Sequence, residues 1–297
     1  MHSSFLAARG IQTPLINTPL SAQLNWFRTL LNSNCPSLEE CVRRLTGAIV
    51  YVGEIGGNDF NYALSQGKSI QEIQTLVPDV VGVIINGVRI QKPNKKRDYI
   101  KERSLVRNQT QEEEEKHRQE QQKKTNRPKA NRVGAMRVVV PGNFPIGCLP
   151  IFLTTLPSVG PGAYDDLGCL HSLNEFAMFQ NNYLQGALGS LRQEFPQVVI
   201  LYADYYSAFQ SVLHRAPFLG FDKQSLLKAC CGIGGSYNYD PFRTCGSQGV
   251  PGCLNPRQYI HWDGLHLTHE AYRRISEILI NDILSKIQCV WKNLLVH

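Results

Sequence analysis

The feature that most constrains the fold of this chain is an alternation of short apolar runs with longer amphipathic segments. Runs rich in β-branched residues occur at 47–53, at the start of 136–150 and at 197–204, and their length and composition indicate buried strands. Strands that alternate with helices predict a largely parallel, layered α/β sheet. We expect the functional loops of such a fold at the carboxyl ends of its strands.

Amphipathic spacing predicts the helices of this fold, with clear examples over 20–31 and 172–195. Ser69 followed by Glu72 forms a capping box that is expected to open a short helix. Thr268 is expected to cap the last helix. The inner face of that helix is predicted to consist of Ile275, Ile278, Leu279, Ile283 and Ile287.

The charge of the chain is concentrated in one segment. Residues 91–132 hold fourteen Lys and Arg and seven Asp and Glu, a net charge of +7 (14 − 7) that equals the net charge of the whole chain. The other residues carry 17 charges of each sign (31 − 14 and 24 − 7). The body of the protein, predicted as one α/β domain of residues 1–90 and 133–297, therefore offers no electrostatic basis for binding nucleic acid.

The charged segment itself has almost no apolar side chains. It cannot bury enough surface to offset the entropy lost on ordering, so we predict a disordered insertion or a solvated, fraying helix over 91–132. A basic RNA-binding tail is the functional alternative. Four consecutive glutamates and the lack of an aromatic platform argue against it.

Nine cysteines suggest an oxidising compartment. Local pairs such as Cys35–Cys41 and Cys245–Cys253 are one way to form disulfides, with an odd thiol left over, and buried unpaired thiols are the alternative. No pair has the Cys-x-x-Cys spacing of a zinc ribbon or a thioredoxin-like site.

The N-terminal residues and the longest apolar runs bear on whether the chain carries a targeting signal or a membrane span. Residues 1–12 lack a basic stretch followed by a sustained apolar run, so they do not have the pattern of a secretory signal. No run of about 18 apolar residues exists, so no membrane span is predicted. Cysteines typical of an exported protein, without an export signal, lead us to expect that an upstream segment is missing.

The stretch HWDGLHLT places Asp263 three positions before His266 in a Gly-containing loop. A carboxylate at that distance can hold one imidazole nitrogen and leave the other free to take a proton, which is the base half of a nucleophilic hydrolase. Asn58, in a Gly-Gly-Asn-Asp loop after the first predicted strand, can supply an amide donor to an oxyanion. Taken alone, the first motif is most often a loop ion pair and the second a turn.

Five motifs together make the chain resemble the plant GDSL esterase/lipase family of the SGNH hydrolase superfamily, over residues 1–90 and 133–297. They are YVGEIGGNDFNYA, VVVPGNFPIGCLP, YADYYSAF, KACCGIGG and HWDGLHLTHEAYRRIS. The resemblance implies a flavodoxin-like three-layer α/β/α fold that hydrolyses carboxylic esters without a metal or cofactor. It also implies a small-molecule or lipid ester as substrate and a secreted protein, which we expect to be monomeric. By the same resemblance Asn58 is the oxyanion-hole residue, His266 the general base and Asp263 its orienting carboxylate.

The chain departs from the family pattern at the nucleophile. The family serine lies in a Gly-Asp-Ser-Leu motif after the first strand, and no Gly-Asp-Ser occurs here. Ser3, Ser4 and Ser236 lack the strand-to-turn context that would present a nucleophile. We therefore predict a chain that is truncated at its N-terminus, lacks the first strands and leaves an open sheet edge at 48–52. Such a chain is expected to be inactive, with a non-catalytic remnant that binds lipid or acyl ligands as the alternative.

Overall fold

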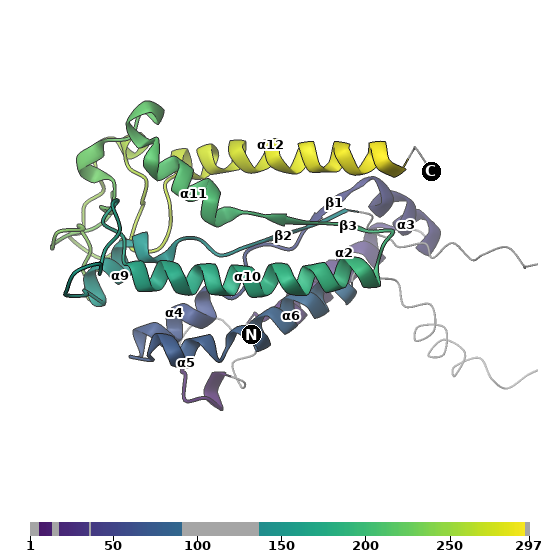
Figure 1. The fold of residues 1–297 in the computed structure, drawn as a ribbon, viewed down its shortest axis with the longest axis horizontal. Helices are drawn as coiled ribbons and strands as arrows, with labels where there is room; N and C mark the ends of the chain where they lie inside the picture. The colour runs from purple at the N-terminus through teal and green to yellow at the C-terminus, as the bar shows by residue number, and fades with distance from the viewer. Residues whose placement is uncertain (1–5, 14–17, 36, 91–136, 295–297) are drawn as a thin grey trace, which may run out of the picture.

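The computed structural model describes residues 6–13, 18–35, 37–90 and 137–294. The predicted insertion 91–132 lies outside these residues. Figure 1 shows the arrangement of the elements. In chain order they are α2 (Leu20–Asn34), α3 (Leu38–Gly47), β1 (Ile49–Tyr51), α4 (Gly57–Ser65), α5 (Ile70–Gln74), α6 (Val77–Ile90), β2 (Arg137–Pro141), η1 (Ile146–Cys148), α9 (Pro150–Thr155), α10 (His171–Glu194), β3 (Val199–Ala203), α11 (Tyr205–His214), η2 (Ala216–Leu219), η3 (Lys223–Ser225), η4 (Pro256–Gln258) and α12 (His269–Leu294).

The three strands of the described residues form one parallel sheet in the order β1-β2-β3. Val50 pairs with Val138 in the first ladder, and Val138 pairs with Ile200 in the second. The register holds all three carboxyl ends at one edge of the sheet. The predicted parallel α/β sheet is confirmed.

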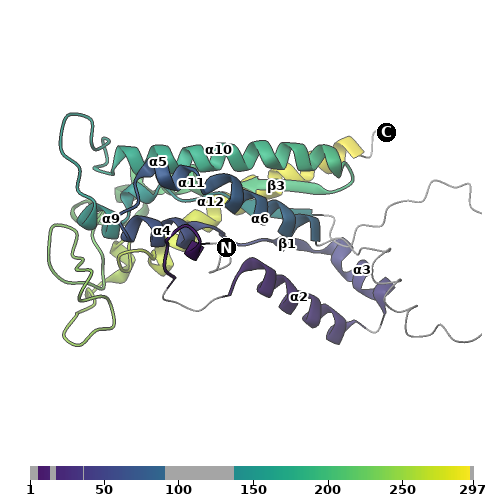
Figure 2. The same ribbon diagram turned by 90° about the horizontal axis from the view of Figure 1, so that it is seen from below.

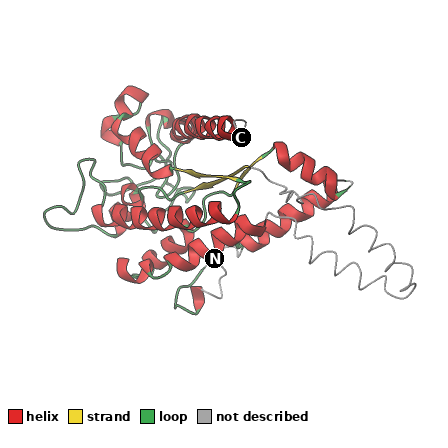
Figure 3. Ribbon diagram, turned by 45° about the vertical axis from the view of Figure 1, so that its right-hand side comes forward, coloured by secondary structure: helices red, strands yellow, loops and turns green. Residues whose placement is uncertain are grey.

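Helices cover both faces of this sheet, which gives the predicted three-layer α/β/α arrangement (Figures 1 and 2). Side chains alternate between the faces along β2, as the pleat of a strand requires. Val138 and Val140 belong to the core cluster that includes residues of α6 and α10, and Val139 belongs to the cluster that includes residues of α11 and α12. Figure 3 shows the strands enclosed between the helical layers.

Strand β1 is the exception to this coverage. Its side chains Ile49 and Tyr51 are 47 % and 45 % exposed, so the expectation of a buried strand is wrong for this segment. The physical reason is that β1 has a hydrogen-bonded neighbour on one side only, since β2 is its single partner among the described strands. Within the described residues, the strand order therefore agrees with the predicted open edge at β1.

The local signals for helix starts are confirmed. Ser69 and Glu72 form a complete capping box at α5. The Thr268 hydroxyl accepts a hydrogen bond from the Ala271 N–H at the start of α12. Ile275, Leu279 and Ile283 are buried and Ile278 and Ile287 pack partly against the same core, as the spacing predicts.

The disulfides differ from the expected local pairs. Cys148 is bonded to Cys169, Cys230 to Cys253 and Cys231 to Cys245. The Cys245–Cys253 pair is therefore wrong, because the fold brings each of these residues to one of two adjacent cysteines on another segment.

The other local pair, Cys35–Cys41, is not tested by the described residues. Cys35 is disulfide-bonded, whereas the side chain of Cys41 lies outside the described residues. None of the described helices combines the length and the apolar character needed to cross a bilayer.

Candidate active site

Asp263 and His266 form the pair that the sequence predicts. Asp263 Oδ2 lies 2.9 Å from His266 Nδ1. The histidine side chain is 69 % exposed and the aspartate side chain 23 % exposed, so the carboxylate is held inside the loop and the ring projects outward. This geometry fixes the ring through Nδ1 and leaves Nε2 available for proton transfer.

The loop is shaped by the same carboxylate. Asp263 Oδ1 accepts hydrogen bonds from the N–H groups of Leu265 and His266, both at 2.7 Å. The Trp262 N–H donates to the His266 carbonyl at 2.8 Å and closes the turn. Gly264 is required inside it, because a Cβ at this position would overlap the ring of Tyr239. Asp263 therefore both orients the histidine and holds the backbone that carries it.

The two members of the pair shift each other's protonation. Partial burial acts to raise the pKa of Asp263, but the hydrogen bonds from His266 and Leu265 outweigh it and hold this pKa below its usual range. The hydrogen bond to Asp263 raises the pKa of His266, and partial burial opposes the change. A general base with a raised pKa binds the proton it removes more firmly.

Tyr272 of α12 is hydrogen-bonded to the backbone of this loop. Its hydroxyl accepts a hydrogen bond from the Leu267 N–H at 3.3 Å. Burial raises the pKa of Tyr272, and the charges of Asp263 and Glu54 raise it further. Glu54 in turn accepts a hydrogen bond from the Gly57 N–H at 3.1 Å, at the start of α4. Sequence analysis missed both residues, although each lies within a motif that it singled out.

Asn58 is the second residue of α4 and is exposed. It follows β1, at the carboxyl end of the strands, and Gly56 before it adopts φ 102° to start the helix. The structure therefore places Asn58 at the carboxyl ends of the strands, where the functional loops are expected. In the part of the chain that is described, its side chain makes no hydrogen bond with His266 or Asp263, so only the latter two are brought into contact.

No nucleophile accompanies the pair in the described residues. Among 6–13, 18–35, 37–90 and 137–294, no side-chain hydroxyl is hydrogen-bonded to the His266 ring, whose one such partner is Asp263. Ser236 is exposed in the segment that follows Cys231. Ser3 and Ser4 lie outside the described residues. Within the described residues, the candidate site thus consists of a histidine and the carboxylate bonded to it.

The loop after β2 is held by a buried amide network. Asn181 of α10 accepts a hydrogen bond from the Asn143 N–H at 2.7 Å and donates to the Asn143 carbonyl at 3.0 Å. Gln180 accepts from the Asn143 side chain at 2.8 Å, and Asn174 accepts from the Gly147 N–H at 2.9 Å. The amphipathic pattern of α10 gave no sign of these contacts, because amides on a helix are usually solvated.

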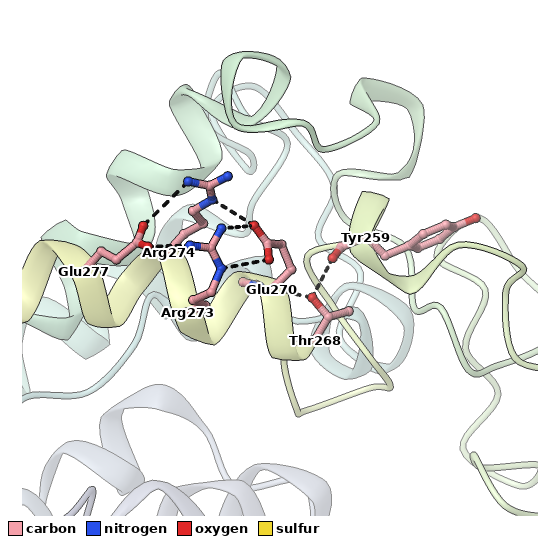
Figure 4. A network of polar contacts seen from close by, with 7 residues as sticks. Tyr259, Thr268, Glu270, Arg273, Arg274 and Glu277 are labelled. Atoms are coloured by element: carbon pink, nitrogen blue, oxygen red, sulfur yellow. Dashed lines mark hydrogen bonds and ion pairs between the residues drawn. The ribbon is translucent and has the colours of Figure 1, made fainter.

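A cavity of about 590 Å³ lies at the start of α12, on residues other than the pair. Its lining includes Thr268, Glu270, Arg273 and Arg274. Figure 4 shows that both arginines are engaged by Glu270 and that Thr268 is hydrogen-bonded to the Tyr259 carbonyl. Among the described residues, no cluster of three or more His, Cys, Asp or Glu side chains could hold a metal ion.

Comparison with known proteins shows which family the sequence matches. The profile of the GDSL-like Lipase/Acylhydrolase family matches residues 42–279, which include the Asn58 loop and the Asp263–His266 pair.

The chain is also similar to individual plant proteins. It is 46 % identical to a GDSL esterase/lipase of Arabidopsis thaliana over 97 % of this chain and 76 % of that protein. It is 43 % identical to acetylajmalan esterase 1 and 44 % identical to acetylajmalan esterase, both of Rauvolfia serpentina, over 98 % of this chain and 65 % of each. The chain thus spans about two thirds to three quarters of the length of these relatives.

Proposed function

This chain belongs to the GDSL-like lipase/acylhydrolase family, and from that premise we propose that it carries the general-base half of a carboxylic ester hydrolase. The observation that carries the proposal is the hydrogen bond between Asp263 Oδ2 and His266 Nδ1. It presents an oriented imidazole with Nε2 free, which is what removal of a proton from an attacking hydroxyl requires.

The roles follow from the chemistry of the groups. His266 accepts the proton of the nucleophile at Nε2 and returns it to the leaving alcohol. Asp263 keeps Nδ1 protonated and stabilises the imidazolium that forms in between. Asn58 donates its amide N–H to the oxyanion of the tetrahedral intermediate. Its position after β1, at the edge where parallel strands end, supports that role. The substrate class is a small-molecule or lipid ester.

We predict that a protein consisting of residues 1–297 turns over esters very slowly or not at all. Loss of a serine nucleophile removes several orders of magnitude in rate, and no described hydroxyl contacts the imidazole. The test is hydrolysis of a chromogenic short-chain ester by the purified chain, by His266→Ala and by His171→Ala, a control histidine exposed on α10. Clear turnover by the chain and by His171→Ala that is abolished in His266→Ala would contradict the predicted inactivity and support the base.

A non-catalytic protein that binds acyl ligands is the second candidate. It is favoured by the exposed apolar side chains of Ile49 and Tyr51 on the open edge and of Ile280 and Leu284 on α12. If this is the function, the folded chain should bind a fatty acid such as decanoate saturably. Calorimetric titration that shows no saturation would exclude it.

We propose that the protein is exported from the cytosol. Three disulfides between described residues persist in oxidising compartments and are rare in the cytosol. We also propose that the protein acts as a monomer.

A further inference from the structure

A second histidine lies in the same loop, in an environment opposite to that of His266. The ring of His261 is fully buried, with 0 % of the residue exposed. Neither Nδ1 nor Nε2 has a hydrogen-bond partner among the described residues. The ring packs edge-on against Phe209 of α11, with centroids 5.8 Å apart and planes at 71°.

The backbone of His261 joins several parts of the site. Its carbonyl accepts a hydrogen bond from the N–H of Cys230, which is disulfide-bonded to Cys253. It forms bridges with Ala229 on one side and with Leu267, next to His266, on the other. A displacement of His261 would therefore move the turn that holds the catalytic pair.

Protonation of this ring is unfavourable where it lies. An imidazolium carries two N–H donors and a charge. Among the described residues no group accepts a hydrogen bond from either ring nitrogen, and the ring is shielded from bulk solvent. Burial lowers the pKa of His261 to about 3, against the attraction of the Asp263 carboxylate. Asp263 is the one charged group in the described chain that acts on the ring.

The other neighbours of the ring do not change this balance. α11 contributes the Phe209 ring. Cys230, whose N–H donates to the His261 carbonyl, is a half-cystine and does not titrate. His266 is the other titratable group of the loop, and its ring is turned to Asp263.

We propose that His261 is an acid-sensitive latch: the loop that carries Asp263 and His266 is closed while the His261 ring is neutral and opens when that ring takes up a proton. The direction follows from linkage, because the ring binds its proton more weakly in the closed loop than in the open one. Above the ordinary histidine pKa of about 6.5 the ring is neutral in both forms of the loop, so the equilibrium constant for opening does not depend on its protonation. Below this pKa, the equilibrium constant for opening rises by up to about tenfold per pH unit.

The catalytic pair cannot produce the same response by itself. The pKa of His266 is raised, so falling pH first charges this ring and strengthens its attraction to Asp263. The pKa of Asp263 is lowered, so the pair weakens only at more acidic pH. An equilibrium constant for opening that already rises below pH 6.5 therefore distinguishes the latch from the pair.

Trp262 provides a local reporter, because it lies beside His261 and is partly exposed. The experiment follows its fluorescence from pH 7.5 to 3.5 in the full oxidised chain with Trp26→Phe and Trp291→Phe, which leave it as the single tryptophan. Far-UV circular dichroism reports global unfolding in the same samples. If His261 acts as the latch, the pH at which the fluorescence changes should lie at least half a unit above the pH at which the dichroism is lost. Coincident transitions would overturn a local opening.

Variants identify the group responsible. His261→Phe keeps an aromatic ring against Phe209 and cannot be protonated, so the fluorescence transition should move at least one pH unit lower. His214→Asn removes an exposed histidine of α11 and should leave the pH of the fluorescence transition unchanged. His266→Gln should also leave it unchanged. An unchanged transition in His261→Phe, or its loss in His266→Gln, would overturn the proposal.

A measurement on the unsubstituted chain covers the case in which His261→Phe does not fold. With ¹³C-labelled histidine, the His261 ring signals should titrate together with the Trp262 fluorescence. A ring that titrates near pH 6.5 while the fluorescence stays constant would overturn the latch, because protonation would then not require opening.

Discussion

The two loops that flank the site are held in different ways. The loop 142–148 is held by amides of α10 that are almost fully buried and are hydrogen-bonded to its backbone. The loop 261–268 is held by the carboxylate of Asp263, by Thr268 and by backbone bonds to a disulfide-bonded segment. The first contains no titratable side chain at these contacts. The second contains two histidines whose pKa values are shifted in opposite directions. The first loop is therefore held by contacts that do not depend on pH, whereas the second contains groups whose protonation can change its contacts.

The largest effect is expected in the loop 142–148. Asn181→Ala leaves both the N–H and the carbonyl of Asn143 buried without this partner, and should lower the free energy of unfolding by about 3 kcal/mol. Chemical denaturation measures the change. Asn182→Ala, at the exposed neighbouring position, is the control and should cost less than about 0.5 kcal/mol. Equal losses in the two variants would mean that the amide network does not hold the loop.

A smaller loss is expected at the end of the other loop. Thr268→Val preserves the shape of the side chain and removes its hydrogen bonds to Tyr259 and Ala271, at an expected cost of about 1.5 kcal/mol. Thr155→Val, which removes one exposed hydrogen bond to the Ile151 carbonyl, is the matched control. If the control loses as much stability as Thr268→Val, the cap is not what anchors this loop.

The smallest effect on stability and the clearest effect on protonation are expected for Asp263→Asn. The amide can still accept from the loop N–H groups, so the stability should fall by less than about 1 kcal/mol. The pKa of His266 should fall, because its raised value depends first on the hydrogen bond to Asp263. Stability from that pair is present below the ordinary histidine pKa and is lost as pH rises through the raised one.

Histidine NMR titration checks this shift. Glu175→Gln, which removes the exposed partner of His171 on α10, should leave the His266 titration unchanged. A His266 pKa that is the same with and without the Asp263 carboxylate would refute the coupling on which the proposed base depends.

Sequence reasoning predicted what depends on neighbours along the chain. The parallel strands, the capping box at Ser69 and the Asp263–His266 contact all follow from local spacing. It could not predict contacts that tertiary structure creates between distant segments. Gln180 reads as a surface residue of α10, but it is buried and bonded to the Asn143 side chain, 37 positions away in the chain.

The disulfides show the same limit, and they have a consequence for how the chain is made. Cys230 and Cys231 are adjacent, and each is bonded to a different residue of the segment that contains Cys245 and Cys253. The crossed arrangement, with partners exchanged, closes loops of nearly the same length, so chain entropy discriminates weakly between the two. Selection must come from the folded surroundings. Oxidation before folding should therefore trap mispaired isomers, and a thiol buffer that permits exchange should recover the native pairing.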